Sequence, residues 1–366
     1  MDEAFEEMLG DLPEDVQFQI SMCLSGNLIR QLSKRHNSEY MRSLNTFSMH
    51  VSHCSKVDMR ALERMLRRMP ALTKLSIYDA YNHNTGIDDI PPLSELKALT
   101  DVTISLKPMR LVTSISELLH LTKLRLTGAR FPDISVLAGI TGLTDLVLEE
   151  SSIPDFGKIA ELKGLRSLGL MCTRTSNISP LAELQGLTNL ELRGNRLVDI
   201  TPLAELPGLR RLDGGCNAIT KTNALAGLRN LAYLGVRDNP IKSLISLGKL
   251  RSLESLDVSG TRVTNITVLK KLQGLTELVL SYSSISDIAA LAKLTNLTKL
   301  VMDYTRVADV TPLAKLTGLK DLSIQGSRHI TERSLSKTLP EMTGLVEFKA
   351  IDWNFPGMFV TFYERA

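Results

Sequence analysis

The chain has 366 residues, and its 43 Lys and Arg residues against 40 Asp and Glu residues leave a net charge of +3. This balance, with only 5% aromatic residues, argues against nucleic acid or an anionic membrane as the main partner. The acidic residues 1–7 lack the pattern of a signal peptide, and no apolar run approaches the ~18 residues of a membrane-spanning helix. We therefore expect an intracellular protein, in the cytoplasm, whose four cysteines are reduced thiols.

The first 43 residues carry apolar side chains at helical spacing and contain no repeat. Val16, Ile20 and Leu24, which are spaced by four, predict a helix that begins near Pro13. Because the end of a stacked array needs a cover, we expect a helical N-terminal cap over residues 1–43.

A second interpretation of this segment rests on a motif. The run from Leu12 to Val16, then Ile20, Leu24 and the run from Ser33 to His36, resembles an F-box, although His36 stands where that family usually has an aromatic residue. The resemblance implies a small helical module that docks, through residues 12–36, onto the adaptor of a cullin ubiquitin ligase. A cap and a docking module both remain open.

Residues 57–69 have apolar side chains at helical intervals and predict an amphipathic helix. Beyond it, leucine recurs every 22 residues from Leu99 to Leu319, which indicates one small unit stacked on copies of itself. We number each unit from this leucine, so that Leu187 is position 1 and Gly208 is position 22. Apolar residues then occupy positions 1, 4, 6, 11, 14, 17 and 20. Leu190 and Leu192 alternate with polar residues, which predicts a strand with these leucines in the core.

Turn signals divide the unit. Position 9 is Asn, Ser or Thr, whose short polar side chains can satisfy backbone groups in a turn. Ser179-Pro180, Thr201-Pro202 and Thr311-Pro312 predict an N-cap followed by proline at the first helical position. Position 22 is mostly Gly or Asn, which predicts a left-handed backbone after the helical turn.

The complete pattern, carried best by residues 199–204 and 309–314, resembles leucine-rich repeats. It is closest to the 22-residue class found in bacterial internalins and in the eukaryotic type-1 phosphatase regulator. The resemblance implies an α/β solenoid with a curved parallel sheet on its concave face and short helical or 3₁₀ turns on its convex face. We expect this solenoid over residues 44–345, followed by an aromatic C-terminal cap over residues 346–366 that covers the open sheet edge.

No catalytic motif interrupts the array, so we expect a non-enzymatic protein that needs no cofactor. The one group with metal-ligand chemistry is interpreted as ordinary cap residues rather than a zinc site; it consists of Cys23, His36, His50, His53 and Cys54. The expected function is that of a monomeric scaffold or regulator, which binds a protein partner on the concave face.

Candidate partner-binding residues follow from positions 3, 5, 7 and 8, which point away from the core. They are Glu149, Met171, Glu191, Arg193, Asp213, Tyr233, Arg237, Val279, Tyr282, Val301 and Tyr304. We expect Tyr282 and Tyr304 to be anchors, because aromatic residues are enriched among interface hot spots. We also expect the small residues Gly169, Gly215 and Gly235 to leave room beside the charged residues. The alternative is that any strand shows some Val and Tyr.

Position 10 adds a candidate basic ridge, formed by Arg130, Arg174, Arg196, Arg262, Arg306 and Arg328. Such a ridge would steer an acidic partner toward the sheet. The alternative is a solvated row that was copied with the repeat.

Overall fold

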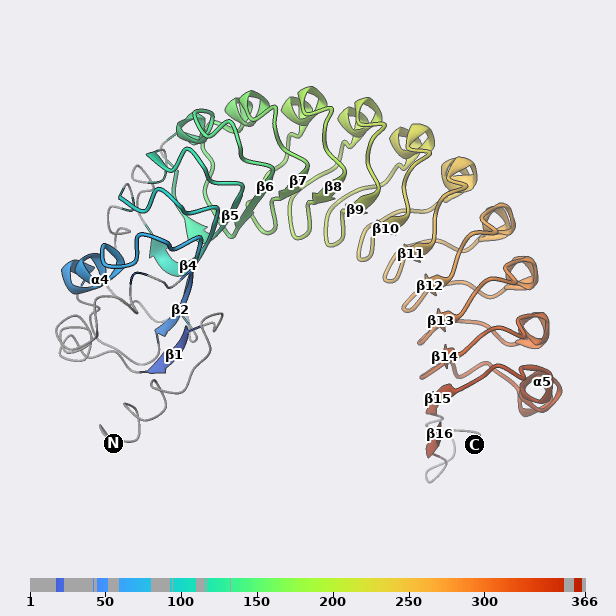
Figure 1. Ribbon diagram of the computed structural model, residues 1–366. Coiled ribbons are helices and arrows are strands. Elements are labelled where there is room, and N and C mark those ends of the chain that lie inside the picture. The colour runs from blue at the N-terminus through green and yellow to red at the C-terminus, as the bar shows by residue number, and fades with distance from the viewer. Residues whose placement is uncertain are drawn as a thin grey trace, which may run out of the picture. The chain divides into compact units, whose positions relative to one another are not determined.

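The computed structural model (Figure 1) describes Phe18–Met22, 42, 45–51, 59–79, 93, 95–109, 115, 117–131, 133–351 and 359–363. The chain divides into two compact units, Met1–Thr173 and Arg174–Ala366, and each is described by itself. Cys23, His36, His53 and Cys54 lie outside the described residues, as does most of the F-box-like segment at residues 12–36.

The first unit contains a parallel sheet in which each strand pairs with the next one along the chain. Its strands are β1 (Phe18–Met22), β2 (Thr46–Val51), β3 (Lys74–Asp79), β4 (Asp101–Met109), β5 (Lys123–Ala129), β6 (Asp145–Glu149) and β7 (Ser167–Gly169). Its helices are α4 (Met59–Leu66) and the 3₁₀ helices η2 (Ile134–Leu137) and η3 (Phe156–Glu161). Helix α4 lies within the range predicted from apolar spacing, and its Leu62, Met65 and Leu66 are buried.

The predicted helix over Val16, Ile20 and Leu24 is wrong at Phe18–Met22. These residues form β1, which runs parallel to β2 with Phe18 opposite Phe47. The segment also alternates apolar and polar residues with a period of two, the period of a strand. The four-residue spacing hid this alternation.

From β8 to β13 the second unit repeats a three-residue strand followed by a 3₁₀ helix, and its last strands are longer. The strands are β8 (Asn189–Glu191), β9 (Arg211–Asp213), β10 (Tyr233–Gly235), β11 (Ser255–Asp257), β12 (Glu277–Val279), β13 (Lys299–Val301), β14 (Asp321–Ser323), β15 (Glu347–Ile351) and β16 (Phe359–Tyr363). The helices are η4 (Ser179–Glu183), η5 (Thr201–Glu205), η6 (Asn223–Gly227), η7 (Ile245–Lys249), η8 (Thr267–Lys271), η9 (Ala289–Lys293), η10 (Thr311–Lys315), α5 (Glu332–Thr338) and η11 (Leu339–Glu341).

Strands β8 to β15 pair in parallel, and β16 returns antiparallel to β15. Leu190 pairs with Leu212 and Leu234 pairs with Leu256, so each strand continues the register of the one before it. Within this unit the strands follow the inner side of a curve and the helical turns follow its outer side (Figure 1). We call these two sides the strand face and the convex side.

The core lies between the strands and the helical turns, as the repeat predicted. Leu190 and Leu256 are fully buried, and Leu212 is 2% exposed. The position 9 residues also behave as expected. Asn239 accepts a hydrogen bond at Oδ1 from the Ile219 amide of the preceding repeat (2.9 Å) and donates from Nδ2 to the Gly214 carbonyl of that repeat (3.0 Å). Each buried Asn therefore joins two repeats.

The capping residue of the helical turns differs from the predicted one. Asp199 Oδ1 accepts hydrogen bonds from the Thr201 amide (2.8 Å) and hydroxyl (2.5 Å), so the carboxylate two residues earlier holds the turn. Asn177 and Asp309 do the same for the turns that begin at Ser179 and Thr311. The Ser or Thr before proline is the donor rather than the cap.

The glycines at position 22 do not have the left-handed backbone that was predicted, because none of them has a positive φ. A side chain at Gly208 would instead approach the Leu187 carbonyl (3.3 Å from an ideal Cβ). Where position 22 is Asn230, its Nδ2 donates to the Pro207 carbonyl (3.1 Å). Close approach of the backbone of the previous repeat therefore favours Gly, whereas Asn230 is accommodated by its hydrogen bond to that repeat.

Candidate functional site

The left-handed backbone lies at position 8, at or just beyond the end of the strand. Positive φ angles occur there in ten successive repeats, at Gly128, Glu150, Cys172, Gly194, Cys216, Asp238, Gly260, Tyr282, Tyr304 and Gly326. A residue other than glycine in this conformation costs about 1–3 kcal/mol. Since the neighbouring repeats use glycine, the fold itself does not require a large side chain at position 8.

Tyr282 and Tyr304 occupy this strained position in adjacent repeats and stack on each other. Their ring centroids are 4.7 Å apart, with an angle of 11° between the ring planes. Their amides donate to the carbonyls of Asp303 (2.9 Å) and Gln325 (2.7 Å), which fixes the backbone of each tyrosine to the next repeat. Tyr282 is nevertheless 64% exposed and Tyr304 46% exposed, so the pair presents a rigid aromatic surface to solvent.

A charged cluster spans β8, β9 and β10. Arg211 lies between an acid and an aromatic ring, because its Nε is 3.9 Å from Glu191 Oε1 and its guanidinium carbon is 3.7 Å from the centre of the Tyr233 ring. Arg193 Nη1 is 3.9 Å from Asp213 Oδ2. Each of these contacts joins a residue of one repeat to a residue of the next.

Electrostatics within this cluster act on Tyr233. Burial raises the pKa of its phenol, and the nearby Asp213 carboxylate raises it further. Asp213 itself is held in place, since its Oδ1 accepts a hydrogen bond from the Gly215 amide (3.0 Å). The cluster therefore presents a neutral phenol between fixed charges of both signs.

The two central glycines do not leave open space, contrary to the prediction. An ideal Cβ at Gly215 would lie 2.9 Å from Arg237 Cγ, and one at Gly235 would lie 3.0 Å from the Tyr233 hydroxyl oxygen. The long side chains of Arg237 and Tyr233 pack over the glycines. The glycines thus allow these side chains to lie flat along the strand face.

The predicted residues are placed as follows. Glu191, Asp213, Tyr233, Val279 and Val301 lie on strands of the second unit. Beyond the strand ends, in the turns of that unit, lie Arg193, Arg237, Tyr282 and Tyr304, whereas the half-buried Glu149 and Met171 belong to the first unit. The structure brings together Arg193 with Asp213 and Tyr282 with Tyr304. It also brings Arg211, the outward residue at position 3 of its repeat, against Tyr233 and Glu191.

The candidate basic ridge is interrupted. All six position 10 arginines are exposed, and none of their guanidinium groups makes an ion pair within the described residues. In the second unit, Ala218, Pro240 and Ser284 occupy the same position in intervening repeats. In that unit Arg174 and Arg196 are neighbours, Arg306 and Arg328 are neighbours, and Arg262 stands alone, so the ridge is not continuous.

Two cysteines fall within the described part of the chain. Cys172 and Cys216 are exposed free thiols, in agreement with the expected reduced state of these two residues. Burial raises the pKa of the Cys216 thiol, and the Asp238 carboxylate, 3.6 Å from its sulfur, acts in the same direction. The thiol form of Cys216 is therefore favoured over the reactive thiolate.

The described residues contain neither a metal-binding cluster nor a membrane-spanning helix. No group of three or more His, Cys, Asp or Glu side chains there could hold a metal ion. None of the helices in this described portion has both the length and the apolar character needed to cross a membrane.

Comparison with solved structures agrees with this architecture. An internalin of Listeria monocytogenes superimposes with a TM-score of 0.65 at 24% identity, over 89% of this chain and 89% of that one. A leucine-rich repeat protein of Leptospira interrogans gives a TM-score of 0.64 at 16% identity, over 91% of this chain and all (100%) of that one. TLR13, in a complex with single-stranded RNA, gives 0.56 at 18% identity, over 92% of this chain and 61% of that one.

A scan of protein-family models and a search of curated proteins gave no match. Parallel three-residue strands alternating with 3₁₀ turns, together with these structural neighbours, define the class: the chain folds as a leucine-rich-repeat solenoid. The structures to which it is most alike include internalins.

Proposed function

We propose that this solenoid is a non-enzymatic protein-binding module that holds a protein ligand on the strand face of its second unit, with Tyr282 and Tyr304 as anchors. One observation carries the proposal. Two stacked tyrosines occupy a strained backbone position, remain exposed, and stand between two repeats that have glycine there, Gly260 and Gly326. Backbone strain of this kind clusters at binding sites, and a large aromatic side chain here is not needed where Gly260 and Gly326 serve.

The charged cluster supports a protein ligand over other classes. Glu191, Arg193, Arg211 and Asp213 present both signs of charge within two strands, and a polyanion would meet repulsion from the acids. Paired surface charges of this kind contribute roughly 0–1 kcal/mol to folding, so their exchange for partner charges costs little. Complementary charges would set the orientation of the ligand rather than its affinity.

The proposal also covers the role of the protein and its cellular location. We assign the chain the role of a monomeric scaffold or regulator inside the cell, supported by the balanced charge and by the two free thiols at Cys172 and Cys216. The alternative role as a cullin-adaptor docking protein receives no support from the described residues. Phe18–Met22, in the middle of the F-box-like segment, forms a strand where a helical module requires a helix.

RNA is the competing ligand to test, because one structural neighbour, TLR13, was solved with single-stranded RNA. A photo-crosslinking residue, benzoylphenylalanine, replaces Tyr304 in the full-length chain. A matched chain carries it at Val198, which is 60% exposed and lies between β8 and η5, outside the strand. Crosslinks to a protein from Tyr304 but not from Val198 support the proposal. Crosslinks to RNA from Tyr304, or equal protein crosslinks from both positions, would overturn it.

A further inference from the structure

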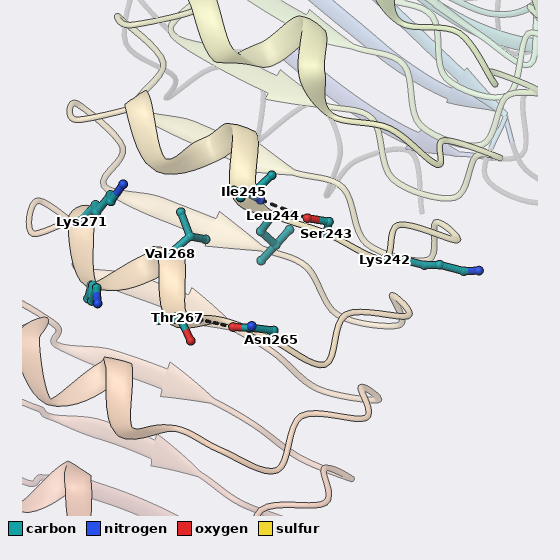
Figure 2. Close-up of a pocket in the computed structure, with 9 residues that line it drawn as sticks. Lys242, Ser243, Leu244, Ile245, Asn265, Thr267, Val268 and Lys271 are labelled. Carbon is teal, nitrogen blue, oxygen red and sulfur yellow. Dashed lines mark hydrogen bonds between the residues drawn. The ribbon is translucent and has the colours of Figure 1, made fainter.

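A groove on the convex side separates the helical turns η7 and η8. Its volume is about 300 Å³, and its lining includes Lys242, Ile245, Val268, Lys270 and Lys271. In Figure 2, Lys242 and Lys271 lie at opposite ends of the view, and Ile245 and Val268 lie between them. The groove is on the side of the second unit away from the strand face.

The apolar part of the groove departs from the repeat. Ile245, at position 15, is 77% exposed. Other repeats of the second unit have Ser, Thr, Asn or Ala at this position: Ser179, Thr201, Asn223, Thr267, Ala289 and Thr311. Isoleucine is therefore not required by the fold, and its exposure is an unfavourable arrangement in the free protein.

Two further departures from the repeat pattern shape the floor of the groove. Position 18 is alanine in five repeats of this unit, at Ala182, Ala204, Ala226, Ala292 and Ala314. In η7 it is Gly248, where an ideal Cβ would lie 2.7 Å from Val268 Cγ2. The absence of a side chain at Gly248 thus lets the Val268 side chain pack against η7. Ile245 and Val268 together form an apolar pair in place of the small or polar residues found in neighbouring repeats.

The charges around this pair are all positive. In η8, position 18 is Lys270 instead of alanine, and Lys242 and Lys271 complete the set. No residue of the lining carries a carboxylate, and in the part of the chain that is described none of these three ammonium groups makes an ion pair.

The basic character extends along the convex side at position 19. Four successive repeats carry lysine there, at Lys249, Lys271, Lys293 and Lys315. A lysine at the end of a helical turn gains from the helix dipole, which offers an explanation based on stability alone. However, the same position is Glu183 in η4 and Glu205 in η5. The fold tolerates either charge at position 19, so stability does not explain why the lysines occupy four successive repeats and the glutamates the earlier ones.

From these departures we infer that the groove between η7 and η8 binds an acidic segment of a partner protein. An apolar side chain of that segment covers Ile245 and Val268, and its carboxylates lie against Lys242, Lys270 and Lys271. A volume of about 300 Å³ accommodates one or two side chains. The lining contains no aromatic ring on which a nucleic-acid base could stack. This site is separate from the proposed ligand surface on the strand face.

The test is fluorescence anisotropy with full-length protein and a labelled peptide of alternating Glu and Leu. Lys270→Glu/Lys271→Glu should weaken binding about tenfold or more, and Ile245→Ser, which restores a residue type of the other repeats, about threefold. Lys299→Glu, an exposed lysine on β13, and Tyr282→Gly/Tyr304→Gly should leave the affinity unchanged. A peptide of Glu alone should bind more weakly than the Glu-Leu peptide.

The inference is overturned by any of three results: no binding of the Glu-Leu peptide, an equal loss in Lys299→Glu, or no effect of Ile245→Ser. Polyuridylate and phosphatidylserine vesicles serve as rival probes. If Lys270→Glu/Lys271→Glu abolishes binding to either of them but not to the peptide, the proposed occupant is wrong. Because Tyr282→Gly/Tyr304→Gly alters only the strand face, its effect on peptide affinity tells failure of the groove proposal apart from failure of the strand-face proposal.

Discussion

The ring of Tyr304 lies directly over the α-carbon of Gly326 in the next repeat. Tyr304 Cε1 and Cδ1 occupy the space where a β-carbon of residue 326 would stand, and Gly326 has a φ of +64°. The aromatic pair is therefore supported from below by the absence of a side chain. Asp238 has the same relationship to Gly260, so side chains at position 8 lean toward the following repeat.

Gly326→Ala should disturb the tyrosine pair. The new methyl group displaces the Tyr304 ring and strains a left-handed backbone, so the free energy of unfolding should fall by about 1 kcal/mol or more. Urea unfolding measures the stability, and near-ultraviolet circular dichroism reports the tyrosine environment. Gly227→Ala is the matched control, because its Cβ would meet nothing within 4 Å, and it should change neither signal. Equal near-ultraviolet spectra for wild type and Gly326→Ala would contradict the described support.

The asparagine at position 9 should contribute more to stability than threonine at the same position. Asn239→Ala leaves the Ile219 amide without an acceptor and removes one of the two donors to the Gly214 carbonyl, which keeps Asn217 Nδ2 (3.1 Å). A loss of about 2 kcal/mol is therefore expected. Thr261 donates only within its own repeat, to the Val258 carbonyl (2.7 Å), so Thr261→Ala should cost about 1 kcal/mol. Chemical denaturation of both variants decides the order. Equal losses would show that the bonds between repeats carry no extra stability.

Acid should weaken the helical turns that are capped by aspartate. The Thr201 hydroxyl and amide donate to Asp199 and lower its pKa, and the Thr311 amide and hydroxyl lower that of Asp309. A folded pKa below the unfolded one gives stability that is present above the unfolded pKa, about 3.9, and is lost as pH falls through the folded pKa.

Asp199→Asn/Asp309→Asn keeps the accepting oxygen, as Asn177 does in η4, but removes the titrating group. Thermal unfolding between about pH 5 and pH 2 should therefore show a smaller loss of Tm in the double variant than in the wild type. Parallel curves for the two proteins would mean that these carboxylates do not contribute to acid sensitivity.

The sequence predicted the repeated strand and its core well, because buried leucines such as Leu190 and Leu256 follow a period that packing enforces at every unit. It failed where backbone geometry rather than burial decides. The positive φ at position 8 could not be predicted, because only four of the ten repeats have glycine there: Gly128, Gly194, Gly260 and Gly326. Position 22 was misread because glycine serves both a left-handed turn and close backbone approach.

The sequence predicted which residues of the candidate site point outward, but not which of them contact one another. Positions 3 and 5 give the outward residues of a strand directly, and Glu191 and Asp213 were found in this way. The stacking of Tyr282 on Tyr304 and the packing of Arg237 over Gly215 depend on side-chain direction between repeats. The groove at Ile245 was not predicted, because the outward positions 3, 5, 7 and 8 lie only on the strand side of the unit.

The most direct test of the central claim compares wild type with Tyr282→Gly/Tyr304→Gly. Both proteins are used for quantitative affinity purification, and their thermal unfolding is measured in parallel. Because glycine relieves the strained backbone while the stacking is lost, Tm should stay within about 3 °C. Recovery of at least one protein partner should fall about tenfold or more. Unchanged recovery of every partner by a folded double variant would contradict the assignment of the tyrosine pair as the anchor of the binding surface.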